Sequence, residues 1–357
     1  MKRRWAASVL FTALVAASLS LAPLPSQYCD AEPDAPAAHP GYRDQLDVNG
    51  RAIFDAVSGA DAATFEMVVD LPAALISDGE GAEAYLSGAV EALWRRAMDA
   101  LKIGAPRAVW LWGESLTTYD RESLFEPFGP GLAVRSLRLS NSPDPAYADD
   151  PSTEEDERQQ KIDALEKAVE GFSSESGDFR GKVSDINRYL RDRATYDPDY
   201  ADKDKKSPYD HDAYGALASE SGYAVCEGYA KAFQLLAEKI GVACFTVFGT
   251  GTPSMEGHAW NYVMTEDGKW YAVDSTWNDA RGEDRYFLLG ASSFFLDHQQ
   301  GTMAGSGTVM PFSYPPLEKG DFDAPPETHE EYSWIAMSLI VGIVIAGLII
   351  ISRRGSH

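Results

Sequence analysis

The fold of this chain is decided by residues 225–279, VCEGYAKAFQLLAEKIGVACFTVFGTGTPSMEGHAWNYVMTEDGKWYAVDSTWND. This stretch contains Cys226, His258 and Asp274, in that order. Nucleophilic acyl transfer by a thiol needs these three residue types: a sulfur that attacks, an imidazole that takes its proton, and a carboxylate that orients the imidazole. The sequence therefore predicts Cys226, His258 and Asp274 as catalytic residues.

Cys226 precedes a predicted amphipathic helix that ends before Gly241, where a left-handed residue is expected. Apolar residues recur after the cysteine at intervals of three and four, namely Tyr229, Ala230, Phe233, Leu236, Ala237 and Ile240. We therefore expect Cys226 at the N-terminus of this helix, where the helix dipole favours a thiolate. The alternative is a small buried core cysteine.

A predicted β-hairpin carries His258 and Asp274. Its strands are the aromatic and β-branched runs 258–264 and 269–274, and Thr265–Gly268 joins them. A two-residue turn would place the two side chains on opposite faces. A three-residue loop, Glu266–Gly268 with a left-handed glycine, makes them diagonal neighbours on one face, about 7 Å apart between backbones. We predict the three-residue loop. The alternatives are a half-buried histidine and an aspartate that only caps a strand end.

Three blocks of the chain resemble the motifs of bacterial transglutaminase-like domains, a papain-like group of thiol enzymes. They are AVCEGYA (224–230), GHAWNY (257–262) and WYAVDSTW (270–277). The resemblance also takes in INRYL (186–190), Tyr196-Asp197 and YFLLG (286–290), and so covers about residues 178–298.

This resemblance implies an α+β fold with a papain/transglutaminase-like core, in which a helix carrying the cysteine packs on an antiparallel sheet carrying the histidine and the aspartate. It implies Cys226 as nucleophile, His258 as general base and then acid, and Asp274 as orienting carboxylate. Animal transglutaminases usually have tryptophan directly after the cysteine, where this chain has Glu227. The resemblance therefore implies thiol chemistry without fixing glutamine–lysine cross-linking.

The net charge is -24, from 31 basic and 55 acidic residues. Because a phosphate backbone would be repelled, we exclude nucleic acid as a partner. A disulfide between Cys226 and Cys244 is not expected, because a helix of about 14 residues, about 21 Å long, separates them. We predict no cofactor and no metal. A zinc site from Cys226 and His258 is a weaker alternative, since it lacks further ligands.

Both ends of the chain predict membrane targeting. A basic start and the apolar run from Trp5 to Ala22 predict a signal peptide over 1–31; a lipoprotein cysteine at Cys29 and an uncleaved anchor are alternatives. The uncharged run from Trp334 to Ile351, with Arg353 and Arg354 after it, predicts a transmembrane helix over 333–352. A proline-rich linker (314–332) precedes this helix, and a cytoplasmic tail (353–357) follows it.

The remaining residues divide at a polar, proline-containing boundary, 142–160. Before it we predict an N-terminal α+β subdomain (32–150), either a substrate-reading cap or a structural extension. Its expected helices are 42–58 and 82–103, and its expected strands are 64–71, 108–112 and 132–139. After it we predict a transglutaminase-like domain (151–313) with helices 161–172 and 179–194. The aspartate-rich segment 196–212 is expected to be a solvated loop, because it lacks the glycine and glutamate of a calcium loop.

We therefore expect a membrane-anchored, extracellular enzyme that transfers acyl groups from the amide bonds of proteins or cell-wall peptides through a thioester. Water as acceptor would make it a peptidase or amidase, and an amine would make it a cross-linking enzyme. The alternative is a non-catalytic surface module on the same fold.

Overall fold

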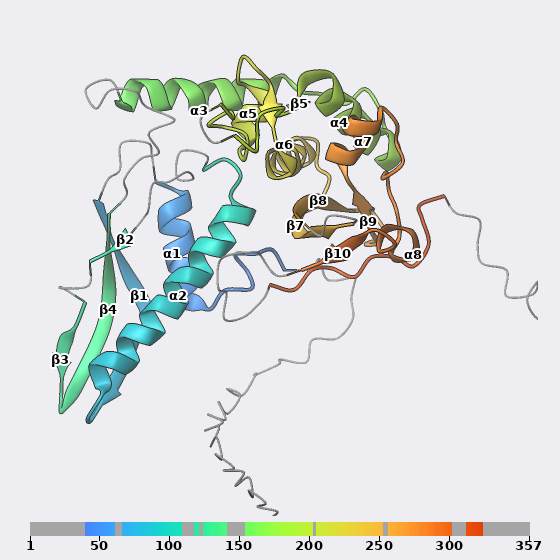
Figure 1. Cartoon of the computed structure of the whole chain (residues 1–357). Helices are drawn as coiled ribbons and strands as arrows, with labels where there is room; N and C mark the ends of the chain where they lie inside the picture. The colour runs from blue at the N-terminus through green and yellow to red at the C-terminus, as the bar shows by residue number, and fades with distance from the viewer. Residues whose placement is uncertain are drawn as a thin grey trace, which may run out of the picture. The chain divides into compact units, whose positions relative to one another are not determined.

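The computed structural model describes residues 40–60, 66–108, 118–120, 124–140, 154–202, 205–252, 256–301 and 312–323. They form a mixture of helices and mainly antiparallel sheets (Figure 1). The predicted signal peptide and transmembrane helix lie outside these ranges, as do all but the first residue of the predicted strand 108–112. Within the ranges, no helix combines the length and apolar character that a membrane span requires.

The described residues of the N-terminal half form one antiparallel sheet and two helices. The sheet has the order β1-β4-β2, and β3 also pairs with β4. The strands are β1 (Glu66–Asp78), β2 (Thr118–Tyr119), β3 (Glu126–Phe128) and β4 (Gly131–Ser140). β1 continues beyond the predicted end at Leu71, and its register with β4 shifts between Asp70 and Leu75. Pro72 lies in this interval, and a proline cannot donate to a regular ladder.

Helices α1 (Val48–Ser58) and α2 (Ala82–Gly104) lie beside this sheet (Figure 1). Ile53 and Val57 from α1, with Leu86 and Val90 from α2, are fully buried in the hydrophobic core. The apolar periodicity of the sequence therefore located α2 within one residue, whereas α1 begins six residues later than predicted. Asp47 caps α1, since its side chain accepts a hydrogen bond from the Gly50 N–H.

Helix α3 (Glu154–Gly171) corrects one prediction, because it begins inside the segment expected to be a polar boundary. Residues 154–157 form its first turn. Helix α4 (Phe179–Arg193) agrees with the predicted helix. Two short elements follow α4 and pair in parallel, β5 (Thr195–Tyr196) and β6 (Tyr223–Ala224), with α5 (Ala213–Leu217) between them.

The aspartate-rich segment 196–212 is not a solvated loop throughout, contrary to the prediction. Asp197, Asp210 and Asp212 are buried. The Asp197 carboxylate accepts hydrogen bonds from the backbone N–H groups of Asp199, at 2.9 Å, and Ser207, at 2.6 Å. This carboxylate folds the loop onto itself, which is a common use of aspartate in turns.

The second sheet has the order β10-β7-β8-β9 and is antiparallel throughout. Its strands are β7 (Cys244–Gly251), β8 (Glu256–Met264), β9 (Trp270–Val273) and β10 (His298–Gln300). Helix α6 (Cys226–Lys239) packs beside this sheet (Figure 1), and its buried face includes Phe233 and Leu236. Gly241, with a φ of 73°, ends the helix as predicted. Helices α7 (Ser275–Arg281) and α8 (Ala291–Phe294) complete this half.

The two halves share one hydrophobic core. The Tyr42 ring packs against Phe245 with ring centroids 5.3 Å apart, and its hydroxyl donates to the Thr246 carbonyl. The same cluster of buried side chains contains Leu101 from α2 and Trp260 from β8. The predicted subdomain is therefore packed on the sheet that carries the candidate site.

Residues 312–323 also belong to this fold, although most of them were assigned to the linker. The Glu318 N–H donates to the Trp270 carbonyl at 2.9 Å, and the Phe322 N–H donates to the Leu288 carbonyl at 3.0 Å. Leu317 forms a parallel bridge with Trp270 at the β9 edge of the sheet. This segment therefore satisfies backbone groups that the edge of a sheet otherwise leaves open.

Candidate active site

Cys226 is the first residue of α6, and Val225 is the N-cap residue. The Val225 side chain has no oxygen that could accept a hydrogen bond, so it does not cap the N–H groups of the first turn. These donors and the helix dipole favour negative charge beside the sulfur. Cys226 and Cys244 are both free thiols, and Cys226 is partly exposed. Burial raises the pKa of the Cys244 thiol well above its ordinary value.

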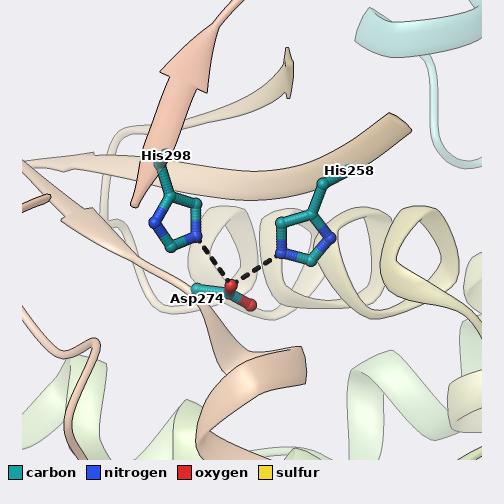
Figure 2. A group of neighbouring side chains, drawn as sticks. All are labelled: His258, Asp274 and His298. Carbon is teal, nitrogen blue, oxygen red and sulfur yellow. Dashed lines mark hydrogen bonds and ion pairs between the residues drawn. The ribbon is translucent and has the colours of Figure 1, made fainter. Parts of the chain in front are cut away.

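The hairpin register agrees with the three-residue loop. β8 and β9 pair Asn261 with Val273 and Met264 with Trp270, and Gly268 has a φ of 82° in the connecting loop. The predicted register is confirmed. It places His258 and Asp274 on one face, where His258 Nε2 lies 2.7 Å from Asp274 Oδ2 (Figure 2).

Asp274 is fully buried and also caps α7, since its Oδ1 accepts the Trp277 N–H at 3.0 Å. Burial alone would raise the pKa of this carboxyl group, but the adjacent His258 and His298 rings hold it below its ordinary value. The charge of Asp274 is therefore stable inside the protein because histidines and a backbone donor surround it.

His258 connects the carboxylate to the sulfur. Burial of its ring lowers the pKa, but the charge of Asp274, their hydrogen bond and a hydrogen bond to Cys226 outweigh that effect and raise it to about 10. The Trp277 ring stacks on the imidazole, with ring centroids 5.0 Å apart and planes inclined by 24°. The structure therefore brings all three predicted residues together, and their catalytic roles stay a prediction.

His298 joins the same site and was not predicted. Its Nε2 lies 3.1 Å from Asp274 Oδ2, and its Nδ1 lies 2.8 Å from Asp297 Oδ1 (Figure 2 shows the first contact). The Tyr286 hydroxyl donates to Asp297 Oδ2 at 2.7 Å. The sequence offers one weak signal for this residue, an Asp-His pair directly after an aromatic run. Nothing in the spacing connects that pair to Asp274.

His258, Asp274 and His298 each offer an atom that could bind a metal, and these atoms lie within 4.8 Å of one another. Both Nε2 atoms lie at hydrogen-bonding distance from one carboxylate oxygen, at 2.7 and 3.1 Å. Ligands around one tetrahedral zinc ion lie about 3.3 Å apart, since each stands about 2.0 Å from the metal. The arrangement therefore fits hydrogen bonds. Among the described residues, Cys226 is not part of this metal-ligand group.

The buried Glu227 carboxylate forms ion pairs with the buried Lys231 of α6 and with the more exposed His211 of the preceding loop. Its Oε1 lies 2.9 Å from Lys231 Nζ, and its Oε2 lies 3.0 Å from His211 Nδ1. Burial would raise the pKa of Glu227, but Lys231, His211 and Lys102 hold it below its ordinary value. Because Lys231 also donates to the His211 carbonyl at 3.1 Å, this cluster attaches the start of α6 to the 205–212 loop.

Two tryptophans of the motif blocks have different surroundings. Trp260 is 1% exposed and packs against Phe294 and His298, as a core residue does. Trp277 is only partly buried, and it contacts both His258 and His298. Of the two, Trp277 is therefore the one that can contact a substrate bound at His258.

A comparison with known protein families matches the region of the candidate site. Residues 165–275, which include Cys226, His258 and Asp274, match the family model described as the transglutaminase-like superfamily. Kyphoscoliosis peptidase from Homo sapiens and from Mus musculus is 37% identical over 86 residues, which is 20% of this chain and 13% of each peptidase. The match thus spans a small part of those relatives.

A solved crystal structure of a TGase is 19% identical to this chain, with a TM-score of 0.29, and the match covers 45% of this chain and 44% of that one. The family match rests on residues 165–275, the range that also holds Cys226 and the hydrogen-bonded pair His258 and Asp274. This chain therefore contains a transglutaminase-like domain.

Proposed function

We propose that this chain is a thiol enzyme that transfers acyl groups from amides through a thioester on Cys226. The observation that supports the proposal is the series Cys226–His258–Asp274, in which His258 is hydrogen-bonded to Asp274 and the neighbouring Cys226 helps to raise the pKa of the imidazole; Cys226 stands at a helix N-terminus inside a transglutaminase-like domain. A thiol needs a base to become a nucleophile, and the base needs a group that fixes its orientation. The series supplies both.

In the proposed first step, the Cys226 thiolate attacks an amide carbonyl carbon and a C–S bond forms. Backbone N–H groups at the start of α6 are candidate donors to the oxyanion, since the Val225 side chain does not cap them. The His258 imidazolium then gives its proton to the amine nitrogen as the C–N bond breaks. A thioester remains on Cys226, and His258 is neutral.

In the second step, water or an amine attacks the thioester while His258 takes a proton from it, and the C–S bond breaks. Water gives hydrolysis of the amide, and an amine gives transamidation. Asp274 stabilises the imidazolium in both steps because it lies 2.7 Å from the ring. We propose proteins or cell-wall peptides as substrates. We also propose that the enzyme acts outside the cell, anchored by residues 333–352.

The test is the reactivity of Cys226 in the full chain. Iodoacetamide at about pH 5.5 should alkylate Cys226 rapidly, because a thiolate–imidazolium pair persists at mildly acidic pH. Mass spectrometry of the peptides separates Cys226 from Cys244. The full chain, incubated with an envelope extract, should also give cleaved, deamidated or isopeptide-linked products, and Cys226→Ala should reduce their formation by about 1,000-fold or more.

Cys244→Ala is the matched control. Cys244 is the other free thiol of the described residues, and it takes no part in the hydrogen bond between His258 and Asp274. It should leave alkylation of Cys226 and product formation unchanged. If Cys226→Ala retained full activity, the thioester mechanism would be wrong. If Cys226 reacted no faster than a free thiol and no product formed, the chain would be a binding module on this fold.

A further inference from the structure

His298 is the one buried titratable side chain at the Cys226–His258–Asp274 site, among the described residues, that the proposed steps do not use. It is 3% exposed and enters from β10, at one edge of the sheet. The Phe294 ring stacks on it, with centroids 4.0 Å apart, and Trp260 and Trp277 lie at 5.2 and 4.4 Å. Its ring is therefore held in one orientation by aromatic neighbours.

Both ring nitrogens of His298 face carboxylate oxygens. Nε2 lies 3.1 Å from Asp274 Oδ2, and Nδ1 lies 2.8 Å from Asp297 Oδ1. An ionised carboxylate only accepts hydrogen bonds, and a neutral imidazole has a single N–H. A neutral His298 would therefore direct a lone pair at one of the two carboxylates. Only the doubly protonated ring donates to both.

We propose that His298 is a positioning residue of the thiol site, held as an imidazolium between Asp274 and Asp297. His298 fixes the Asp274 carboxylate, and the negative charge of this carboxylate is shared between His298 and His258. The role of His298 in acyl transfer rests on the function proposed above. The charge on His298 and its effect on Cys226 do not depend on that function. Asp297 is fixed in turn by the Tyr286 hydroxyl, which donates to its Oδ2 at 2.7 Å.

The charge on His298 has a defined effect on its neighbours. The two imidazole rings lie 5.6 Å apart, so a positive His298 opposes the charge of His258 and favours that of the Cys226 thiolate. The other charged or titratable groups around His298 are Asp274, Asp297 and Tyr286, with Arg281 and Arg285 against the Tyr286 ring. Removal of the positive charge should therefore raise the pH at which the thiol ionises.

The test measures the rate of Cys226 alkylation by iodoacetamide against pH in the full chain. His298→Gln keeps an N–H donor for Asp274 but removes the charge, and it should move the acid midpoint of this profile upward by about half a unit to one unit. Asp297→Asn removes the partner that keeps the second proton on His298, so it should shift the midpoint in the same direction and by less. Gln299→Asn, an exposed neighbour on β10, is the control and should give the wild-type profile.

A merely structural His298 gives a different result. In that case His298→Gln lowers the melting temperature while the midpoint stays unchanged, and the proposal is wrong. If His298→Gln does not fold, Asp297→Asn decides, because an unchanged midpoint in that variant also overturns the proposal. A shifted alkylation midpoint in a protein that forms no acyl-transfer product would support the charge on His298 and reject the proposed enzymatic function instead.

Discussion

Asp274 is the residue on which the geometry of the site depends. Its two oxygens lie at hydrogen-bonding distance from His258, His298 and the Trp277 N–H, and it has no exposed surface. A buried carboxylate with this many donors both orients side chains and stabilises the fold. Replacement of Asp274 should therefore affect activity and stability together.

We predict that Asp274→Asn reduces kcat/KM by about 100-fold or more, because the amide nitrogen cannot accept from the imidazole donors. The same change should cost about 3 kcal/mol of stability, since it leaves buried donors unpaired. Chemical denaturation and assays on one substrate measure the two effects. Asp267→Asn is the control, because the Asp267 side chain is exposed and pairs only with Lys269 and Thr265. A variant with normal kcat/KM would remove Asp274 from the mechanism.

The raised pKa of His258 predicts how the stability of the fold depends on pH. Its pKa rises from an ordinary value of 6.5 to about 10 in the folded protein. A raised pKa means that the folded state holds the proton more tightly, so the added stability is full below about pH 6.5 and is lost as pH rises to about 10. The melting temperature should fall over that window, and it should fall less in His258→Gln. An equal decrease of melting temperature in the wild type and in His258→Gln would contradict the raised pKa of His258.

At this scale the sequence predicted part of the site. Cys226, His258 and Asp274 could be found because each has a local context: a helix start, a strand and a strand end. His298 could not be found, because its contact with Asp274 arises where β10 pairs with the far side of β7. The contact joins residues 24 positions apart in the chain, and it leaves no periodic signal.

At the scale of elements, the loop between β8 and β9 fixes the register that places His258 and Asp274 together. Gly268, with a φ of 82°, allows three residues to connect the strands. A shift by one residue would move Asp274 to the other face of the sheet. The register was predictable because a left-handed glycine at this position is typical of a three-residue hairpin loop.

We predict that Gly268→Ala lowers the free energy of unfolding by about 1 kcal/mol, because a side chain disfavours positive φ. Denaturant unfolding measures the change. The matched control is Gly88→Ala in α2, where an added Cβ meets nothing within 4 Å and φ is not positive. The control should be neutral or stabilising by up to about 1 kcal/mol. Equal effects at both glycines would show that the loop conformation does not depend on glycine.

Two elements were mispredicted for a common reason. The start of α3 and the loop containing Asp197 both lie in polar segments rich in acidic residues, which we assigned to a boundary between the halves and to a solvated loop. Helix α3 begins inside the boundary segment. In the loop the Asp197 carboxylate accepts backbone N–H groups. Composition alone does not distinguish a helix start or a folded loop from a solvated segment.

At the scale of the whole molecule, the N-terminal half and the sheet of the candidate site share a core. Tyr42, which is 4% exposed, contacts Phe245 and Thr246 across the two halves. We expect the halves to unfold together, because neither buries this surface alone. The sequence did not predict the shared core, since apolar periodicity shows that a face is buried and not which element covers it.

We predict that Tyr42→Ala lowers stability by about 3–5 kcal/mol, as for other large buried aromatic residues. Unfolding should remain a single transition, with the same midpoint by far-UV circular dichroism and by tryptophan fluorescence. Tyr85→Ala is the control, because Tyr85 is 68% exposed on α2, and it should change stability by less than about 0.5 kcal/mol. Separate transitions for the two probes would mean that the halves are independent.

The segment 312–323 has a practical consequence for anyone who prepares a shortened version of this protein. A stop codon placed after residue 313, the predicted end of the transglutaminase-like domain, would delete the partners of the Trp270 and Leu288 carbonyls. The product would expose an open strand edge and aggregate. Shortened versions should therefore extend at least through Asp323. A poor yield from versions that end earlier would reflect the missing backbone contacts at the β9 edge rather than toxicity.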